Sequence, residues 1–297
     1  MKLTEKHFPF QGISLDVFKE GRMKIGLGIM VVIVFIALFA DTLSPYPLEG
    51  YGQVPSEATT RVLLPPSWSH LFGTDSVGRD VFSRVLIGSR YALLQVIVVV
   101  SASVMIGLMV GVLAAYYRGV LGSVIQYATE LFMSVPSIVI ALAIALAFGR
   151  GLGTVVTSLI MTWWSWYARI SFVYARSVVE LEYVLLAKLS GLSSFKIITR
   201  HVVRNVYQPV LVQAITDMGS VLLEATAINF LGLGLPPGSP EWGVIIFEGK
   251  DVLTAAPWIS LFPGVFLLLT TVSFGLIGDS LRERIDPRLR KRWRLWF

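Results

Sequence analysis

Four polar residues interrupt an otherwise apolar stretch near residue 220, and they are the side chains best spaced to do chemistry inside a membrane. This polar seam consists of Gln213, Asp217, Ser220 and Glu224. The spacing i, i+4, i+7 and i+11 places all four on one face of an α-helix. An acid in the hydrocarbon layer costs at least ~2.5 kcal/mol, so it must face protein or water. Two interpretations stay open: the seam lines a solute pathway, or it forms hydrogen bonds between helices.

Other kinds of chemistry find little support in the composition. The chain has no cysteine, which excludes thiol nucleophiles and cysteine metal sites. Its three histidines, His7, His70 and His201, lie far apart, and no compact metal-ligand spacing or catalytic triad can be argued. No Gly-x-x-x-x-Gly-Lys-Ser/Thr segment occurs either, so we expect the chain to hold no nucleotide phosphate. We therefore expect no catalytic residue, metal or cofactor in this chain.

The elements that carry the seam are apolar helices. Of 297 residues, 55% are hydrophobic and 15% charged, whereas soluble domains carry roughly 25% charged residues. Apolar runs near 20 residues predict transmembrane helices. Six such runs occur: Ile25–Ala40, Tyr91–Tyr117, Leu131–Gly149, Gly151–Ala168, Pro209–Leu235 and Val252–Gly278. The sequence thus predicts an all-α polytopic membrane protein with six transmembrane helices and both termini on one side.

The distribution of Lys and Arg orients the chain. Of 25 such residues, 19 fall on the face that holds both termini, which predicts that this face is cytoplasmic. The net charge of +6 therefore reflects topology and gives no support for a nucleic-acid partner. The predicted segments are a cytoplasmic segment 1–24, a first transmembrane helix 25–43, an external segment 44–90, a five-helix core 91–279 with a cytoplasmic loop 177–207, and a basic cytoplasmic tail 280–297. Signal-peptide cleavage after Ala40 is the alternative for the first span, although Leu38 fits the small-residue rule poorly.

The cytoplasmic loop contains a predicted helical hairpin, Glu182–Asn205. Good helix formers fill its first half, Gly191 suits a left-handed cap, and Ser193 or Ser194 can cap a second helix. An apolar stripe then recurs at Phe195, Ile198, Val202 and Val206, beside a basic stripe of Lys196, Arg200 and Arg204. Periodicity alone leaves two interpretations: the hairpin lies on the bilayer surface, or it docks on a partner protein.

The hairpin resembles the cytoplasmic coupling loop, or EAA loop, of ABC-importer permeases of the dipeptide, oligopeptide and nickel branch. The matching positions are Glu182, Tyr183, Val184, Ala187, Gly191, Ser193, Ile197, Ile198, Arg200, His201 and Asn205, and Lys188 and Lys196 keep the charge of the family's arginines. Leu185, Leu186 and Arg204 depart from the family's Glu-Ala and Pro. The resemblance implies an ATPase-coupling site made of Glu182, Tyr183, Val184, Ala187, Lys188, Gly191, Ser193, Phe195, Ile198, Arg200 and His201.

Three further segments resemble the same family in the same order. The segment Phe72–Arg90 matches the external Gly-Thr-Asp-x-x-Gly-Arg-Asp signature, Asn229–Ile246 the loop after the fifth span, and GDSLRERIDPRLR the tail. Glu224 matches an acidic position before the family's F-L-G-L-G motif. For the external motif we expect Asp75 to cap a turn, Asp80 to cap a helix from Val81, and Arg79 and Arg84 to pair with these acids. The alternative is contact with a solute-binding protein through Gly73, Thr74, Asp75, Gly78, Arg79, Asp80 and Trp242.

The resemblance implies the second-type (C-like) permease subunit of a type I ABC importer in a prokaryotic inner or plasma membrane. The implied partners are a second homologous permease, two ATPase subunits that bind ATP and Mg, an extracytoplasmic solute-binding protein and membrane lipid. Di- or oligopeptides are the expected solutes, with nickel or sugar oligomers as the alternative. A secondary transporter or channel, or a membrane-embedded enzyme, is the rival from another class.

Aromatic residues give two smaller expectations. Trp242 and Trp258 are expected to anchor the chain at a membrane interface. The cluster Trp163, Trp164, Trp166 and Tyr167 is expected to form an interfacial belt with Arg169. Pro136 is expected to kink the third span, near a structural Glu130.

Overall fold

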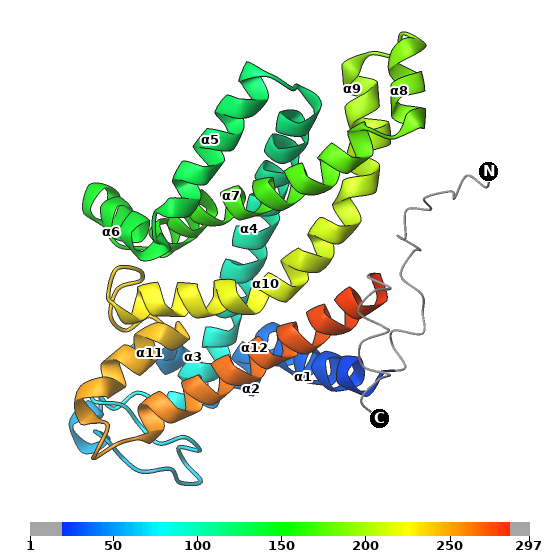
Figure 1. The fold of residues 1–297 in the computed structure, drawn as a ribbon. Coiled ribbons are helices and arrows are strands. Elements are labelled where there is room, and N and C mark those ends of the chain that lie inside the picture. The colour runs from blue at the N-terminus through cyan, green and yellow to red at the C-terminus, as the bar shows by residue number, and fades with distance from the viewer. Residues whose placement is uncertain (1–19, 286–297) are drawn as a thin grey trace.

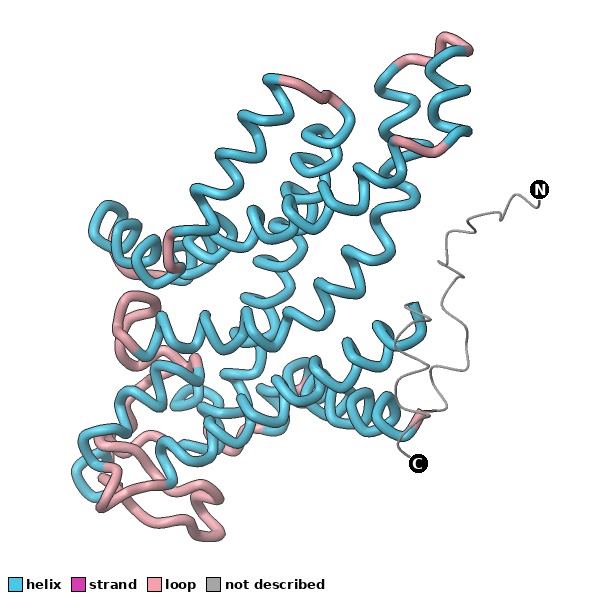
Figure 2. Tube along the Cα trace, viewed as in Figure 1, coloured by secondary structure: helices cyan, strands magenta, loops and turns pink. Residues whose placement is uncertain are grey.

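The structure, a computed structural model, describes residues 20–285, and this range is helical with no β-strand (Figures 1 and 2). The α-helices are α1 (Gly21–Leu38), α2 (Ala40–Leu43), α3 (Pro47–Gly50), α4 (Val81–Tyr116), α5 (Val120–Ser134), α6 (Ser137–Phe148), α7 (Leu152–Val179), α8 (Glu182–Leu189), α9 (Ser194–Ile197), α10 (Arg204–Phe230), α11 (Trp242–Gly249) and α12 (Trp258–Ile285). Short 3₁₀ or π segments, η2 (Ala58–Thr60), η3 (Ile198–Val203) and η4 (Lys250–Val252), complete the order. The predicted all-α class is confirmed. Most of segment 1–24 and the end of the tail 280–297 lie outside the described residues.

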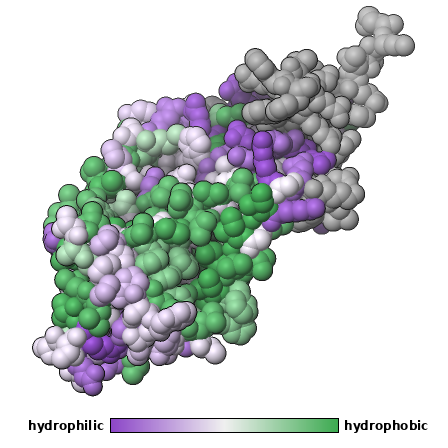
Figure 3. Space-filling view, turned by 90° about the horizontal axis from the view of Figure 1, so that it is seen from below, coloured by the Kyte–Doolittle hydropathy of each residue, from purple (hydrophilic) through white to green (hydrophobic). Residues whose placement is uncertain are grey.

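Four helices of the described chain are long and apolar enough to cross a membrane: α1, α4, the continuous helix Ser194–Phe230, and α12. A fifth crossing is possible if α5 and α6 form one broken span. Helix α7 has 28 residues and only two charged ones, Arg169 and Arg176, but its mean hydropathy is too low for this set. Figure 3 shows the matching surface, a broad hydrophobic area between polar ends. The chain is therefore a multi-pass membrane protein.

The third predicted span, Leu131–Gly149, is wrong as a single helix. The chain breaks between α5 and α6, whose axes differ by 86°. The cause is Pro136, which lacks an N–H and forces the preceding Val135 out of the helical region, to φ −95° and ψ 124°. Leu131–Ser134 therefore end one helix, and the rest of the stretch begins another.

Helix α4 packs along α7 through two small residues one turn apart, Gly107 and Gly111. A β-carbon on Gly107 would lie 2.6 Å from the carbonyl oxygen of Trp164, and one on Gly111 would overlap that of Ala168. Close backbone approach of this kind holds helices together where no water is present to drive association. On the other side of the molecule α1 lies along α12, where Ser273 Oγ donates to the Gly26 carbonyl at 2.7 Å.

Candidate functional site

The polar seam lies on α10 and faces α7. Asp217 is buried: its Oδ1 accepts from Gln213 Nε2 at 2.8 Å and its Oδ2 from Trp166 Nε1 at 3.1 Å. Glu224 Oε2 accepts from Trp163 Nε1 at 3.1 Å. The two helices run antiparallel, so Trp163 bonds to Glu224 and Trp166, further along α7, bonds to the earlier Asp217. An interhelical hydrogen bond from a tryptophan thus stabilises each carboxylate.

The four residues of the seam differ in whether their polar atoms have hydrogen-bond partners and in how exposed they are. Both carboxylate oxygens of Asp217 are engaged, whereas within residues 20–285 no hydrogen bond reaches Glu224 Oε1. Glu224 is partly exposed and Ser220 is exposed. Asp217 therefore has both carboxylate oxygens bound within the protein, whereas Glu224 keeps one oxygen without a partner in the described range and Ser220 is exposed.

Two members of the predicted aromatic belt, Trp163 and Trp166, bond through their indole N–H groups to acids on α10. Trp164 packs edge-on against Phe132 of α5, with ring centroids 5.2 Å apart. An indole only donates and a carboxylate only accepts, so in an apolar medium each satisfies the other. The acids on α10 therefore orient these rings, and a sequence pattern within α7 alone could not predict this.

The external motif forms the caps that its sequence predicts. Asp80 Oδ2 accepts from the backbone N and the Oγ of Ser83, at 2.8 and 2.7 Å, and α4 begins at Val81. Asp75 Oδ1 accepts from the backbone N–H groups of Val77 and Arg79, at 3.0 and 2.9 Å. Both acids are buried. The structural interpretation of the motif is thus confirmed for the caps.

Behind the caps lies an external ion cluster of Asp75, Arg79, Arg84 and Glu248, in which Glu248 is partly exposed and the other three residues are buried. Arg79 Nε and Arg84 Nη1 donate to Asp75 Oδ2 at 2.7 and 2.8 Å. The same two arginines reach Glu248 Oε2 on α11, at 2.9 and 2.7 Å. The expected pairing with Asp80 is wrong, because that carboxylate is taken by Ser83 and by His70. Glu248 is 164 residues from Arg84 and carried no signal in the sequence.

A second hydrogen-bonded group extends the external cluster through His70. Its Nδ1 lies 2.9 Å from Asp80 Oδ1, and its Nε2 lies 3.1 Å from Arg61 Nη2. A guanidinium only donates, so Nε2 must accept and Nδ1 must carry the proton. Arg61 also pairs with Glu49 at 3.0 Å, and Glu49 Oε2 accepts from the Asp80 N–H at 2.8 Å. This network ties α3 and the loop before the motif to the start of α4.

Trp242 and Trp258 are not the interfacial anchors that we expected. Trp242 is fully buried, and its indole donates to the Val85 carbonyl at 3.0 Å. Trp258 donates to the Thr74 carbonyl at 3.1 Å. Both rings therefore pin the last part of the chain to the external motif. The seven motif residues proposed for contact with a binding protein are all buried, so they support an outer surface instead of forming it.

The predicted helical hairpin, Glu182–Asn205, forms in the structure. Helix α8 spans Glu182–Leu189, and Gly191 follows with φ 77°, the left-handed region that favours glycine. Ser193 occupies the N-cap position of α9, without a side-chain cap bond. A π-helical segment, Ile198–Val203, then joins α9 to α10. Single π turns inside helices often mark functional sites.

The apolar stripe of the hairpin does not face outward. Ile198, Val202 and Val206 are buried in the main hydrophobic core, and only Phe195 of the stripe is exposed. Three of the four stripe residues are therefore not available for either predicted contact of the hairpin, with the bilayer surface or with a partner protein. The stripe instead fixes the hairpin to the helix core, because α10 continues directly from it.

A different apolar surface is exposed at the hairpin tip, defined here as Leu186, Leu189, Leu192 and Phe195. Leu189 is 84% exposed and Phe195 74% exposed. Of the predicted coupling residues, Val184, Ala187 and Ile198 are buried, His201 is partly buried, and the others, Glu182, Tyr183, Lys188, Gly191, Ser193, Phe195 and Arg200, are exposed.

The hairpin contacts the end of α4. Tyr116 Oη lies 3.2 Å from Ser194 Oγ, and Lys188 Nζ lies 4.5 Å from the centre of the Tyr116 ring. Within the hairpin, Asn205 Nδ2 donates to Tyr183 Oη at 3.1 Å, and partial burial of that hydroxyl raises the pKa of Tyr183 although the residue as a whole is exposed. The contact of Lys188 with the Tyr116 ring is a cation–π contact, which contributes about 0.5–1 kcal/mol at exposed sites.

Comparisons with known proteins agree with this architecture. Residues 103–291 match the family model described as binding-protein-dependent transport system inner membrane component. The chain is 37% identical over 257 residues to the probable D,D-dipeptide transport system permease protein DdpC of Escherichia coli K12, covering 86% of each chain. It is 34% identical over 272 residues to the di/tripeptide transport system permease protein DppC of Pseudomonas aeruginosa, covering 89% of this chain and 88% of that one. A putative peptide transport permease of Brucella suis is 35% identical over 92% of this chain. The resemblance seen in the hairpin and the external motif is therefore confirmed, and the chain belongs to the family of binding-protein-dependent transport system inner membrane components.

Proposed function

We propose that this chain is the membrane-spanning permease subunit of an ATP-driven importer of di- or oligopeptides, and that it forms half of the translocation pore. One observation supports the solute class. The relatives that this chain matches over most of their length are named as peptide or dipeptide permeases. ATP hydrolysis takes place in separate ATPase subunits, since this chain is a permease and not an enzyme.

The proposed topology has six spans with both termini in the cytoplasm. It counts α1, α4, the broken pair α5–α6, α7, α10 and α12 as one crossing each. Supporting this, α4 and α7 pack in parallel through Gly107 and Gly111, so α7 crosses at the same depth as α4. The excess of Lys and Arg on the side of both termini supports the cytoplasmic assignment. The bacterial relatives support the inner or plasma membrane as its location.

The proposed assembly contains a second permease, two ATPase subunits and an extracytoplasmic solute-binding protein. The hairpin tip is the surface that would dock on an ATPase subunit, because it is apolar, exposed and rimmed by Lys188 and Arg200. Affinity purification of the tagged chain from gently solubilised native membranes should recover these partners, identified by mass spectrometry. Recovery of the chain alone, or only with copies of itself, would favour a carrier or channel.

The solute class is tested by transport. In proteoliposomes that hold the purified complex, we expect uptake of a radiolabelled dipeptide to require both ATP and the binding protein. Uptake driven by an ion gradient without ATP would overturn the importer assignment. Uptake of nickel or a sugar oligomer in place of the peptide, with the same ATP requirement, would keep the machinery and replace the solute.

The role of the polar seam is tested by one isosteric pair. Glu224→Gln keeps an oxygen to accept from Trp163 but removes the charge that is open to the pathway, so we expect the KM for peptide uptake to change roughly three- to tenfold, or ~0.7–1.4 kcal/mol. Asp217→Asn is the matched control, since the same exchange occurs at a carboxylate already satisfied by two donors. Equal uptake by wild type and Glu224→Gln would assign Glu224 to helix packing.

A further inference from the structure

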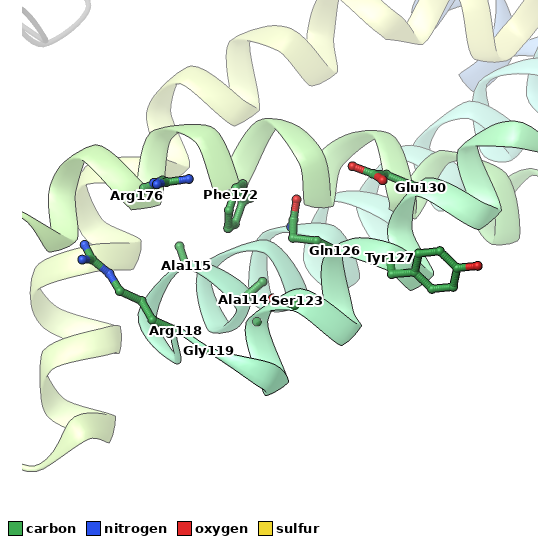
Figure 4. A pocket seen from close by; sticks show the side chains of 11 residues that line it. Ala114, Ala115, Arg118, Gly119, Ser123, Gln126, Tyr127, Glu130, Phe172 and Arg176 are labelled. Carbon is green, nitrogen blue, oxygen red and sulfur yellow. The ribbon is translucent and has the colours of Figure 1, made fainter.

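A cavity of about 470 Å³ lies between the end of α4, the start of α5 and the last turns of α7 (Figure 4). Its lining has polar groups at both ends and apolar groups along the side. Arg118 and Arg176 lie together at one end, and Tyr127 and Glu130 lie at the other (Figure 4). No part of the transport mechanism proposed above uses this cavity.

The arginine end is suited to an anion. Arg118 Nη2 pairs with Glu180 at 2.8 Å, and this pair is exposed on both sides. Arg176 makes no ion pair with any residue in the range 20–285. Helix α5 begins beside these arginines with Gly119 as its N-cap and no capping side chain, so its first N–H groups and the positive end of its dipole face the same region.

Gln126 supplies a further donor in the wall of the cavity. Its Oε1 accepts from Arg169 Nη1 at 3.4 Å, which leaves the amide nitrogen to face elsewhere. That Nε2 atom is buried and has no hydrogen-bond partner in the described part of the chain. A buried unpaired donor costs about 1–3 kcal/mol unless something accepts from it.

The two ends of the cavity differ in charge. Glu130 is held by Arg169 at 2.9 Å. It lies ten residues along α5 from Val120, which is about 15 Å at the rise of an α-helix. Because Arg169 pairs with it, its charge is balanced within the protein. At the arginine end, the two guanidinium groups of Arg118 and Arg176 face the single carboxylate of Glu180, so the group bound there should carry net negative charge.

The outer face of α5 continues the cavity as an apolar strip of Val120, Val124, Tyr127 and Leu131, all strongly exposed. Val120 is 83% exposed. A free phosphate ion would make no use of this strip, whereas a lipid chain would cover it. Basic pockets between transmembrane helices on the cytoplasmic side suit anionic head groups in this way.

We propose that the cavity binds an anionic phospholipid of the inner leaflet, with its phosphate at Arg118 and Arg176 and an acyl chain along the apolar strip of α5. The assignment of the lipid to the inner leaflet rests on the proposed topology. The charge and the shape of the site come from the structure alone. The bound lipid lies next to Tyr116, which contacts Ser194 of the coupling hairpin, so it also steadies the end of α4 against the hairpin.

The test uses native mass spectrometry of the full-length chain, delipidated in detergent and then given phosphatidylglycerol, phosphatidylcholine or glycerol phosphate at equal concentration. We expect retained phosphatidylglycerol in wild type and roughly tenfold weaker retention in Arg176→Gln, or about 1.4 kcal/mol. Arg150→Gln is the matched control, because Arg150 is an exposed arginine in the turn at the other end of α7. Retention of glycerol phosphate as strong as that of the lipid would replace the lipid with a free anion.

A second variant tests the cavity without changing charge. Ser123 lines the cavity and is exposed, so Ser123→Trp should fill the space and displace the lipid while both arginines remain. Unchanged retention in both Ser123→Trp and Arg176→Gln, or equal retention of phosphatidylcholine and phosphatidylglycerol by wild type, would overturn the proposal. None of these measurements involves transport, so their outcome is separate from that of the proposed function.

Discussion

The external ion cluster should be the most sensitive point of the fold, and Arg84→Met is the substitution that tests it. The Arg84 side chain is fully buried and bonds to Asp75, Glu248 and the Ser239 carbonyl. Methionine has a similar length but no charge. The variant leaves the buried carboxylate of Asp75 and the partly exposed carboxylate of Glu248 to share the single cation of Arg79.

The expected magnitude follows from burial. Removing one partner of a buried ion pair destabilises a protein by about 3–5 kcal/mol, because the other charge stays buried without compensation. Arg84 Nε has no hydrogen-bond partner in the described chain, so methionine also removes one unpaired donor. We therefore expect a loss near the lower end of the range, about 3 kcal/mol in the free energy of unfolding.

The assay is equilibrium unfolding in mixed micelles titrated with sodium dodecyl sulfate, followed by circular dichroism. Arg169→Met is the control, since its pair with Glu130 is 46% and 59% exposed and should contribute less than about 1 kcal/mol. The double variant Arg84→Met/Glu248→Gln restores one cation to one acid, so we expect it to cost clearly less than the sum of its two single variants. If Arg84→Met loses no more stability than Arg169→Met, the cluster does not hold the external part of the fold.

Two further predictions concern the hairpin and the loop before α11. Gly191→Val places a branched side chain at φ 77°, which costs about 1–2 kcal/mol, so we expect weaker co-purification of the ATPase subunits with normal membrane expression; full association would refute docking through this turn. Burial raises the pKa of Glu241 from 4.5 to about 8, although the Val244 and Gly243 N–H groups and Asn229 favour its charged form. A carboxyl with a raised folded-state pKa stabilises the fold fully below pH 4.5, and this contribution is lost as the pH rises towards 8. Glu241→Gln should therefore flatten the fall in unfolding free energy across that window, and an unchanged slope would place the titrating group elsewhere.

Local patterns predicted the features that depend on local chemistry. The cap at Asp80, the turn at Asp75 and the left-handed Gly191 each follow from a preference of one residue for one backbone geometry, and the structure has all three. The centres of the apolar helices follow from hydrophobicity in the same way. Their ends do not, since α4 begins at Val81, ten residues before the uncharged window at Tyr91, with Arg84 buried inside it.

What the sequence could not provide is the identity of distant partners. Nothing in the local pattern of Trp163 distinguishes a ring at a lipid interface from one that donates to Glu224, 61 residues away. The same holds for Trp242 and for Glu248, which is an ordinary surface acid until α11 folds beneath α4. The period of the stripe Phe195–Val206 correctly predicted a buried face. Periodicity does not say which surface covers that face, and here it is the protein's own core.

Helix α4 connects the two regions where the chain is expected to meet its partners. It is a continuous helix of 36 residues, about 54 Å long at the helical rise, with no proline in it. Its first turn is fixed by Asp80 and Arg84 in the external cluster, and its last residue, Tyr116, contacts the coupling hairpin. A helix this long bends gently but does not stretch, so a displacement of the hairpin must either tilt α4 and move the external cluster or break the contact at Tyr116. The buried stripe of the hairpin opposes the second outcome, because Ile198 and Val202 hold it to the core. Motion at the hairpin tip is therefore expected to reach the outer face through α4, and the external ion cluster is the rigid end against which that motion acts.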